Sequence, residues 1–164
     1  MTYLHMAKHV LKSTQLINAS IEELWDFFCS PLNLATITPP YMNFRITSQC
    51  DTSEGLFEGQ LITYKVSPLL KVPLTWVTEI TQVLKHHSFV DKQKKGPYKL
   101  WHHEHIFEQQ EKGVLMTDIV TYELPLGIIG EIAHFLFIRK QLKAIFAYRT
   151  AKIDDLFDNN ANKS

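Results

Sequence analysis

The sequence predicts an α+β fold, with a curved antiparallel sheet of about seven strands wrapped around one long C-terminal helix. The first observation is a helical stripe of large apolar residues that begins at Ile128. It continues through Ile132, Phe135, Ile138, Leu142, Ile145, Phe146, Ile153 and Leu156. The second observation is a series of short strand-like segments before this stripe. A long helix that buries one stripe needs a broad concave partner, so we expect a sheet that encloses an interior.

One strand and two short helices open the chain. Residues His9–Ile17 alternate in polarity, which predicts the first strand. Ser20 and Glu23 fit a capping box, so a helix is expected to begin directly after Ser20. A second short helix near residues 32–37 ends before Pro39-Pro40, because consecutive prolines cannot continue an intrahelical hydrogen-bond ladder.

Six further strands and the long helix complete the predicted order β-αα-β6-α. Turns rich in glycine, proline or charged residues separate the strands. The predicted strands lie near Phe44–Cys50, Gly59–Val66, Leu74–Val83, Ser88–Lys94, Tyr98–Gln109 and Val114–Leu124. A polar tail from Asp158 is expected to fray.

Composition limits the function classes. The 164 residues, 45% of them hydrophobic, fit one domain over residues 1–164. Lys plus Arg equals Asp plus Glu at 17 each, so no strong basic field predicts a nucleic-acid partner. No apolar run approaches the roughly 20 residues of a membrane span, so no integral membrane segment is expected, and the predicted location is cytoplasmic. Cys29 and Cys50 show no metal-type spacing and are expected to be reduced core residues.

The order of elements and a set of short motifs carry a resemblance to a known family. The motifs are Trp25-Asp26-Phe27-Phe28, Pro31-Leu32-Asn33-Leu34, Thr38-Pro39-Pro40, Gly96-Pro97-Tyr98, the alternation Trp101/His103/His105/Phe107, and Tyr122-Glu123-Leu124-Pro125-Leu126-Gly127. Over about residues 8–157 the chain resembles the START-like superfamily with its helix-grip fold. More narrowly, it resembles the SRPBCC proteins labelled polyketide cyclase/dehydrase or lipid-transport-like, including those associated with cell-division-inhibitor-type proteins. The resemblance implies an interior cavity, but the superfamily spans carriers, receptors, cyclases and oxygenase subunits, so it does not name a ligand.

A hairpin near residues 110–113 fixes which side chains share a face. If Gln110 pairs with Gly113, the opposite pairs are Phe107 with Met116, His105 with Asp118, His103 with Val120 and Trp101 with Tyr122. This register gathers the bulky aromatic residues on one face, which we expect to look inward. A slip of one residue would separate His105 from Asp118.

His105 opposite Asp118 is the sharpest chemical feature of the sequence. A carboxylate can fix the tautomer of an imidazole and raise its basicity, as in proton-transfer sites. Asp91, which alternates with Phe89 and Gln93, could add a second acid, and Arg149 lies on the inner face of the last helix. Three interpretations stay open: the polar groups satisfy one another structurally, they bind the polar end of a ligand, or they perform acid–base catalysis.

Cofactors and metals have weaker support in the sequence. His103 and His105 share a strand face with a carboxylate opposite, yet ligation needs donors that converge on one point, which sequence cannot show. We therefore predict no metal. The sequence contains no glycine-rich phosphate loop, dinucleotide motif or nucleophile elbow, so no cofactor is predicted either.

The leading functional hypothesis is binding or transport of a small hydrophobic molecule. The predicted ligand-binding residues are Trp76, Phe89, Asp91, Gln93, Trp101, His103, His105, Phe107, Met116, Asp118, Val120, Tyr122 and Arg149. One alternative is a cofactor-independent cyclase- or dehydratase-like enzyme, in which His105 and Asp118 move a proton on a polyketide-like substrate. A further alternative, suggested by the fused relatives, is an interaction module with a filled core and a protein partner.

An unusually apolar loop, Ser67–Leu74, joins two of the predicted strands. Such a loop can mark a portal, a partner site or a membrane surface, or it can fold back over one end of the sheet. If it is a portal, an apolar ligand would enter there or past Pro39-Pro40-Tyr41.

Overall fold

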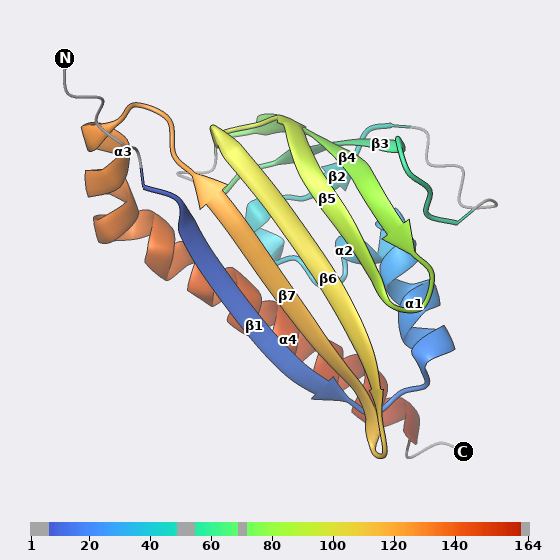
Figure 1. The fold of residues 1–164 in the computed structure, drawn as a ribbon. Helices are drawn as coiled ribbons and strands as arrows, with labels where there is room; N and C mark the ends of the chain where they lie inside the picture. Colours follow the sequence, from blue (N-terminus) through green and yellow to red (C-terminus); the bar gives the residue numbers. More distant parts are fainter. Residues whose placement is uncertain (1–6, 49–54, 69–71, 162–164) are drawn as a thin grey trace.

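A single seven-stranded antiparallel sheet frames the molecule (Figure 1). The computed structural model describes residues 7–48, 55–68 and 72–161. The strands lie in the order β1-β7-β6-β5-β4-β3-β2. Their bounds are β1 His9–Ile17, β2 Arg45–Ile46, β3 Leu61–Val66, β4 Leu74–Leu84, β5 Ser88–Lys95, β6 Leu100–Gln110 and β7 Gly113–Glu123. The sheet curves over the C-terminal helix, so the predicted helix-grip architecture is confirmed.

Two short helices follow β1, as predicted. Helix α1 spans Ile21–Cys29 and begins with the expected capping box: the Glu23 amide donates to the Ser20 hydroxyl at 3.3 Å, and the Ser20 amide donates to the Glu23 carboxylate at 2.9 Å. Helix α2 is shorter than predicted, at Pro31–Leu34, and a 3₁₀ turn, η1, follows at Pro40–Met42.

The long C-terminal helix is built from three consecutive segments. These are α3 at Ile128–Ala133, a π-helical turn η2 at His134–Ile138, and α4 at Arg139–Ala161. Among the described residues, none of the helices combines the length and apolarity needed to cross a bilayer.

The predicted apolar stripe is buried only in its second part, so the prediction was wrong for the first turns. Ile138, Leu142 and Ile153 are buried, whereas Ile132 and Phe135 are exposed. The reason lies in the length of the sheet: α3 lies at one end, beside the start of β1, while α4 runs beneath the strands (Figure 1). Periodicity placed these residues on one face correctly, but no strand covers that face at α3.

Two other predictions involve residues outside the described ranges. Within the described part of the strand predicted at Phe44–Cys50, the structure has the two-residue β2, and Cys50 falls within residues 49–54, which are not described. The apolar loop Ser67–Leu74 includes residues 69–71, also outside the described chain. Cys29 is a buried free thiol, and burial raises its pKa to about 12, as befits a core residue.

The register of the β6–β7 hairpin is confirmed. Gln110 pairs with Gly113, and His105 lies opposite Asp118. Gly113 has a φ of 129°, and a Cβ there would collide with the carbonyl oxygen of Ile17. Glycine is therefore required at the point where the hairpin passes the end of β1.

Replacement of Gly113 tests this requirement. Gly113→Ala should lower the free energy of unfolding by about 3 kcal/mol, because it adds a backbone collision to an unfavourable φ. Gly59 is the matched control: its φ is 85°, but no atom lies within 4 Å of a Cβ built there. Gly59→Ala should therefore cost only about 1 kcal/mol. Urea unfolding measures both values, and equal losses would contradict the collision.

Candidate functional site

A cavity of about 190 Å³ lies between the sheet, helices α1 and α2, and helix α4. Most of its wall is apolar. The apolar lining includes Phe28, Leu34, Ile62, Trp76, Phe89, Trp101, Leu142 and Phe146. Small-molecule sites usually measure about 300–1,000 Å³, whereas a cavity of about 150 Å³ can hold benzene. The cavity therefore has room for a single ring or a short aliphatic molecule.

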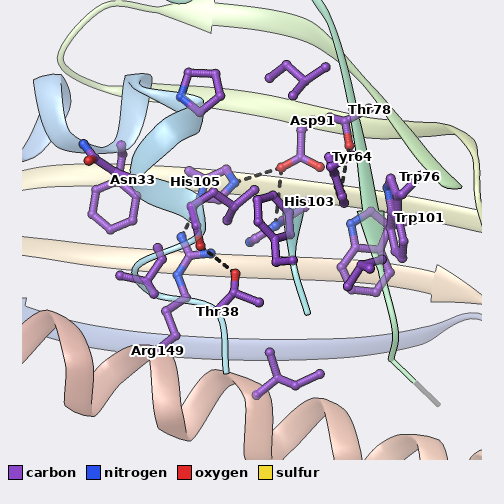
Figure 2. A pocket seen from close by; sticks show the side chains of 18 of the residues that line it. Asn33, Thr38, Tyr64, Trp76, Thr78, Asp91, Trp101, His103, His105 and Arg149 are labelled. Carbon is purple, nitrogen blue, oxygen red and sulfur yellow. Dashed lines mark hydrogen bonds and ion pairs between the residues drawn. The ribbon is translucent and has the colours of Figure 1, made fainter. Parts of the chain in front are cut away.

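A polar cluster occupies one wall of this cavity (Figure 2). Asp91 comes from β5, His103 and His105 come from β6, and Arg149 reaches in from α4. Asp118 on β7 lies against the two histidines and completes the cluster. His103 and His105 point to the same side because residues two apart on a strand share a face. The strand register places Asp91 opposite His103 and Asp118 opposite His105.

Each carboxylate contacts both imidazole rings through one oxygen. Asp118 Oδ1 lies 2.9 Å from His103 Nε2 and 2.9 Å from His105 Nδ1. Asp91 Oδ2 lies 3.0 Å from His105 Nε2 and 3.4 Å from His103 Nδ1. The ring centroids lie 3.8 Å apart, and the ring planes are inclined by 39°. Arg149 closes the cluster from the helix, with one guanidinium nitrogen 3.5 Å from Asp118 Oδ1.

The charges of the cluster balance if one histidine is protonated. Burial opposes a charged Asp118, but Arg149 and the hydrogen bonds from His103 and His105 hold its pKa well below the usual range. Burial likewise opposes the charge of Asp91, and His103 and His105 outweigh it, so its pKa is also lowered. Two carboxylates and one guanidinium leave a single negative charge, which one imidazolium neutralises.

The two histidines differ in the direction of their pKa shift, and so in how readily each holds that proton. Burial disfavours protonation of His105, but its hydrogen bonds to Asp118 and Asp91 prevail and raise its pKa. For His103, burial and the neighbouring charge of His105 prevail over the carboxylates, so its pKa is lowered. Of the two rings, His105 is therefore the one that holds a proton more readily.

Three side chains of the cluster also carry donor atoms of the kind that bind metal ions. Asp91, His103 and His105 offer donor atoms that all lie within 4.8 Å of one another. A bound ion, however, lies in the plane of each imidazole, about 2.0–2.1 Å from the nitrogen. The planes of the two rings are inclined by 39°, and their nitrogens already lie within 3.4 Å of carboxylate oxygens. A metal ion at this site would have to compete with these hydrogen bonds.

A second set of possible ligands, His9, Glu131 and His134, lies where β1 meets the C-terminal helix. The rings of His9 and His134 stack with centroids 3.6 Å apart and planes inclined by 17°. Their in-plane lone pairs therefore follow two nearly parallel planes and do not converge on one point. His9 Nε2 instead contacts the Glu131 carboxylate at 3.0 Å, and His134 Nε2 contacts the Tyr122 hydroxyl at 2.8 Å.

Seven of the thirteen residues predicted to bind a ligand line the cavity, namely Trp76, Phe89, Asp91, Trp101, His103, His105 and Arg149. Asp118 lies behind the histidines. Gln93 hydrogen-bonds the backbone of Tyr98. The remaining four, Phe107, Met116, Val120 and Tyr122, belong to the packed core. They share the inner face of the sheet, but helices cover that face toward both ends of β6 and β7.

Several lining residues were missed by the sequence analysis. Tyr64 and Thr78 line the cavity from β3 and β4, and the Tyr64 hydroxyl lies 3.2 Å from the Thr78 hydroxyl (Figure 2). Alternation along the strands would have found them, because Thr78 is two residues from Trp76. Asn33 and Thr38 also line the cavity, but they lie on or after α2, where no periodic pattern marks them.

Two hydrogen-bond donors of cavity-lining residues have no partner among the described residues. The indole nitrogen of Trp76, Nε1, is buried and unpaired. A buried donor without an acceptor costs about 1–3 kcal/mol. Arg149 Nε is unpaired in the same way. The wall of the cavity therefore holds donors that a bound acceptor could satisfy.

Comparisons with known proteins identify the fold. No family model matches the chain, and neither does any curated protein. Among solved structures, a protein from Mycobacterium smegmatis matches over 92% of each chain, with a TM-score of 0.65 and 18% identity. The di-domain ARO/CYC protein StfQ of the steffimycin biosynthetic pathway matches 94% of this chain and 52% of its own, with a TM-score of 0.70 and 11% identity.

A third solved structure is more similar in sequence. A nucleoside-diphosphate sugar epimerase from Corynebacterium glutamicum is 25% identical over 88% of this chain, with a TM-score of 0.63. The match spans only 28% of that epimerase. The structural neighbours thus include an ARO/CYC protein with the same fold. The resemblance to proteins associated with cell-division-inhibitor-type proteins stays unconfirmed.

The pH dependence of stability tests the charge balance. Asp118→Asn should lower the free energy of unfolding by about 3 kcal/mol, because it leaves Arg149 and His105 with one carboxylate fewer. The lowered pKa of Asp118 stabilises the fold above its unfolded value of about 3.9 and ceases to do so as pH falls through the folded value. The raised pKa of His105 stabilises the fold below about pH 6.5 and ceases to do so above its folded value.

The difference between wild type and Asp118→Asn should therefore be largest between about pH 4 and pH 6.5. Urea unfolding across this range measures it. Asp26→Asn, which alters an exposed acid on α1, is the control and should change stability by less than about 0.5 kcal/mol. A difference that stays constant from neutral to acid pH would exclude the charge balance described above.

Proposed function

We propose that the chain binds a small, largely apolar molecule that carries a hydrogen-bond acceptor, within the cavity between the sheet and α4. The observation that carries this proposal is a mostly apolar cavity with a polar cluster in its wall and a buried donor, Trp76 Nε1, that has no partner in the described part of the chain. A core that only needed to be filled would gain nothing from an unsatisfied indole at this position.

The polar cluster supports the same conclusion. Asp91, His103, His105 and Arg149 face the cavity together, so a ligand group placed there meets both donors and acceptors. Their mutual hydrogen bonds fix the side chains before a ligand arrives, which lowers the entropy cost of binding. The apolar wall supplies affinity, and the few polar groups fix orientation.

The size of the cavity restricts the ligand to a compact molecule. A single ring with one carbonyl or hydroxyl group fits about 190 Å³, whereas a long acyl chain requires the walls to move. The small volume of the cavity supports binding of a compact ligand more directly than bulk lipid transport.

Acetophenone and toluene form a matched pair of probes for this proposal, since they differ mainly in the carbonyl acceptor. Acetophenone should bind more tightly than toluene by isothermal titration calorimetry. Trp76→Phe should weaken acetophenone binding about five- to tenfold and leave toluene unchanged, because it removes the N–H and keeps the aromatic surface. Trp25→Phe makes the same substitution in the core, outside the cavity lining, and should change neither affinity.

Native mass spectrometry of the purified protein provides an independent check. A co-purifying small molecule of the predicted class would identify a natural ligand. If no molecule co-purifies and neither probe binds, the binding proposal fails, and the interaction-module alternative gains support.

A second candidate function is acid–base catalysis on a cyclisation or dehydration substrate. The specific observation in its favour is His105, which faces the cavity, has a raised pKa and is held between two carboxylates. Such an imidazolium can donate a proton to a bound carbonyl, with Asp118 and Asp91 fixing its orientation. The fold shared with ARO/CYC proteins is consistent with this chemistry but does not assign it.

Turnover separates the two functions. A compound extracted from the protein should be recovered unchanged after incubation with wild type if the protein only binds it. If His105 acts as an acid, the compound is converted, conversion falls as pH rises through the raised pKa of His105, and His105→Gln abolishes it while binding persists. Equal conversion by wild type and His105→Gln would exclude that role.

A further inference from the structure

The N-terminal part of the long C-terminal helix, made of α3 and η2, exposes six large apolar side chains. They are Ile128, Ile129, Ile132, Phe135, Leu136 and Phe137, and between 54% and 79% of each residue is exposed. We call this set the apolar end. From typical areas of large side chains, its exposed surface is on the order of 600 Å², the upper limit for the largest apolar patch of a typical monomer. Patches of this size are often functional.

The position of α3 and η2 explains why consecutive residues are exposed. Phe135, Leu136 and Phe137 on η2 are exposed, and Ile138 is the buried residue of that turn. α3 lies at one end of the sheet, beside the start of β1, where the strands do not cover the apolar side chains (Figure 1).

Positive charge follows directly after the apolar end. Arg139, Lys140 and Lys143 are exposed on the next turns of the same helix. Glu131 is the one acid between residues 126 and 143, and its carboxylate is paired with His9 at 3.0 Å. The segment therefore presents apolar side chains bordered by cations without a competing free carboxylate.

We propose that the apolar end docks onto an anionic lipid surface. Its side chains would enter the boundary between headgroups and acyl chains, while Arg139, Lys140 and Lys143 contact lipid phosphates. Charge complementarity favours this occupant over a second copy of the chain, which would supply apolar surface but no excess of anions, since its formal net charge is zero. The docking is a separate property from ligand binding in the cavity.

The docking surface and the cavity share one continuous helix. Leu142 and Phe146 line the cavity, and Leu142 comes one residue before Lys143. A membrane contact at the apolar end would therefore place the cavity wall within a few helical turns of the lipid, which is a source of small apolar molecules.

Vesicle co-sedimentation tests the proposal with the full chain. The probes are vesicles of phosphatidylcholine alone and vesicles of phosphatidylcholine and phosphatidylglycerol in a three-to-one ratio. Wild type should sediment with the anionic vesicles, and binding should fall as salt rises. The double variant Phe135→Ser/Phe137→Ser should lose at least about tenfold in affinity, because each buried aromatic contributes more than 1 kcal/mol. Its control, Leu61→Ser/Leu84→Ser, removes two exposed leucines elsewhere and should bind as wild type does.

A charge variant tests the contribution of the cations that border the apolar end. Lys140→Glu/Lys143→Glu should weaken binding to anionic vesicles at least about tenfold, since each cation near such a surface contributes about 1 kcal/mol. Lys92→Glu/Lys112→Glu makes the same exchange at exposed sites outside the helix and should have a much smaller effect.

Three results would overturn the docking. Wild type could fail to sediment with anionic vesicles, or Phe135→Ser/Phe137→Ser could bind like wild type. Alternatively, light scattering could show a dimer that the same variant converts to a monomer, without vesicle binding, which would assign the apolar end to a second copy. Acetophenone binding by the Phe135→Ser/Phe137→Ser variant is measured in parallel, so failure of docking is distinguishable from failure of ligand binding.

Discussion

The packing of two buried carboxylates against one guanidinium and two imidazole rings is the constraint on which the site depends. Arg149 comes from α4 and Asp118 from β7, so their contact joins the helix to the sheet across the interior. Asp91 adds a second negative charge, and the raised pKa of His105 favours the proton that would balance it. A buried charge without a partner is costly, so this cluster couples the position of the helix to the protonation state of the cavity wall.

The same inner face of the sheet serves as core at its ends and as cavity wall in its middle. Phe107 and Val120 lie on that face, yet helices cover them and they pack as ordinary core residues. Between them, the helices leave space over His103 and His105. The cavity therefore arises from how far the helices reach, while the strand sequence decides which polar groups line it. The unpaired indole of Trp76 adds a directional preference to a wall that is otherwise mostly apolar.

Local sequence patterns such as caps and turns predicted much of the fold. Contacts that depend on the three-dimensional arrangement of strands and side chains were missed. Ser20 opened α1 as its capping pattern required, and the turn at Gly113 set the register that places His105 opposite Asp118. The 2.9 Å contact between His103 and Asp118 was not predicted, because it runs diagonally and depends on sheet twist and side-chain rotamers. Periodicity likewise could not tell that Phe135 would be exposed, since it indicates which residues share a face and not whether that face has a partner.

The same apolar pattern has two different roles along the C-terminal helix. In α4, Leu142 and Phe146 face the sheet and form part of the cavity wall, and Arg149 joins the polar cluster. In α3 and η2, residues such as Phe137 face outward because the strands end before them. Both parts are nevertheless held to the sheet. Glu131 contacts His9 on β1 and His134 contacts Tyr122 on β7, while in α4 Arg149 contacts Asp118. A contact that shifts α3 and η2 would therefore act on β1 and β7 as well as on the helix that lines the cavity.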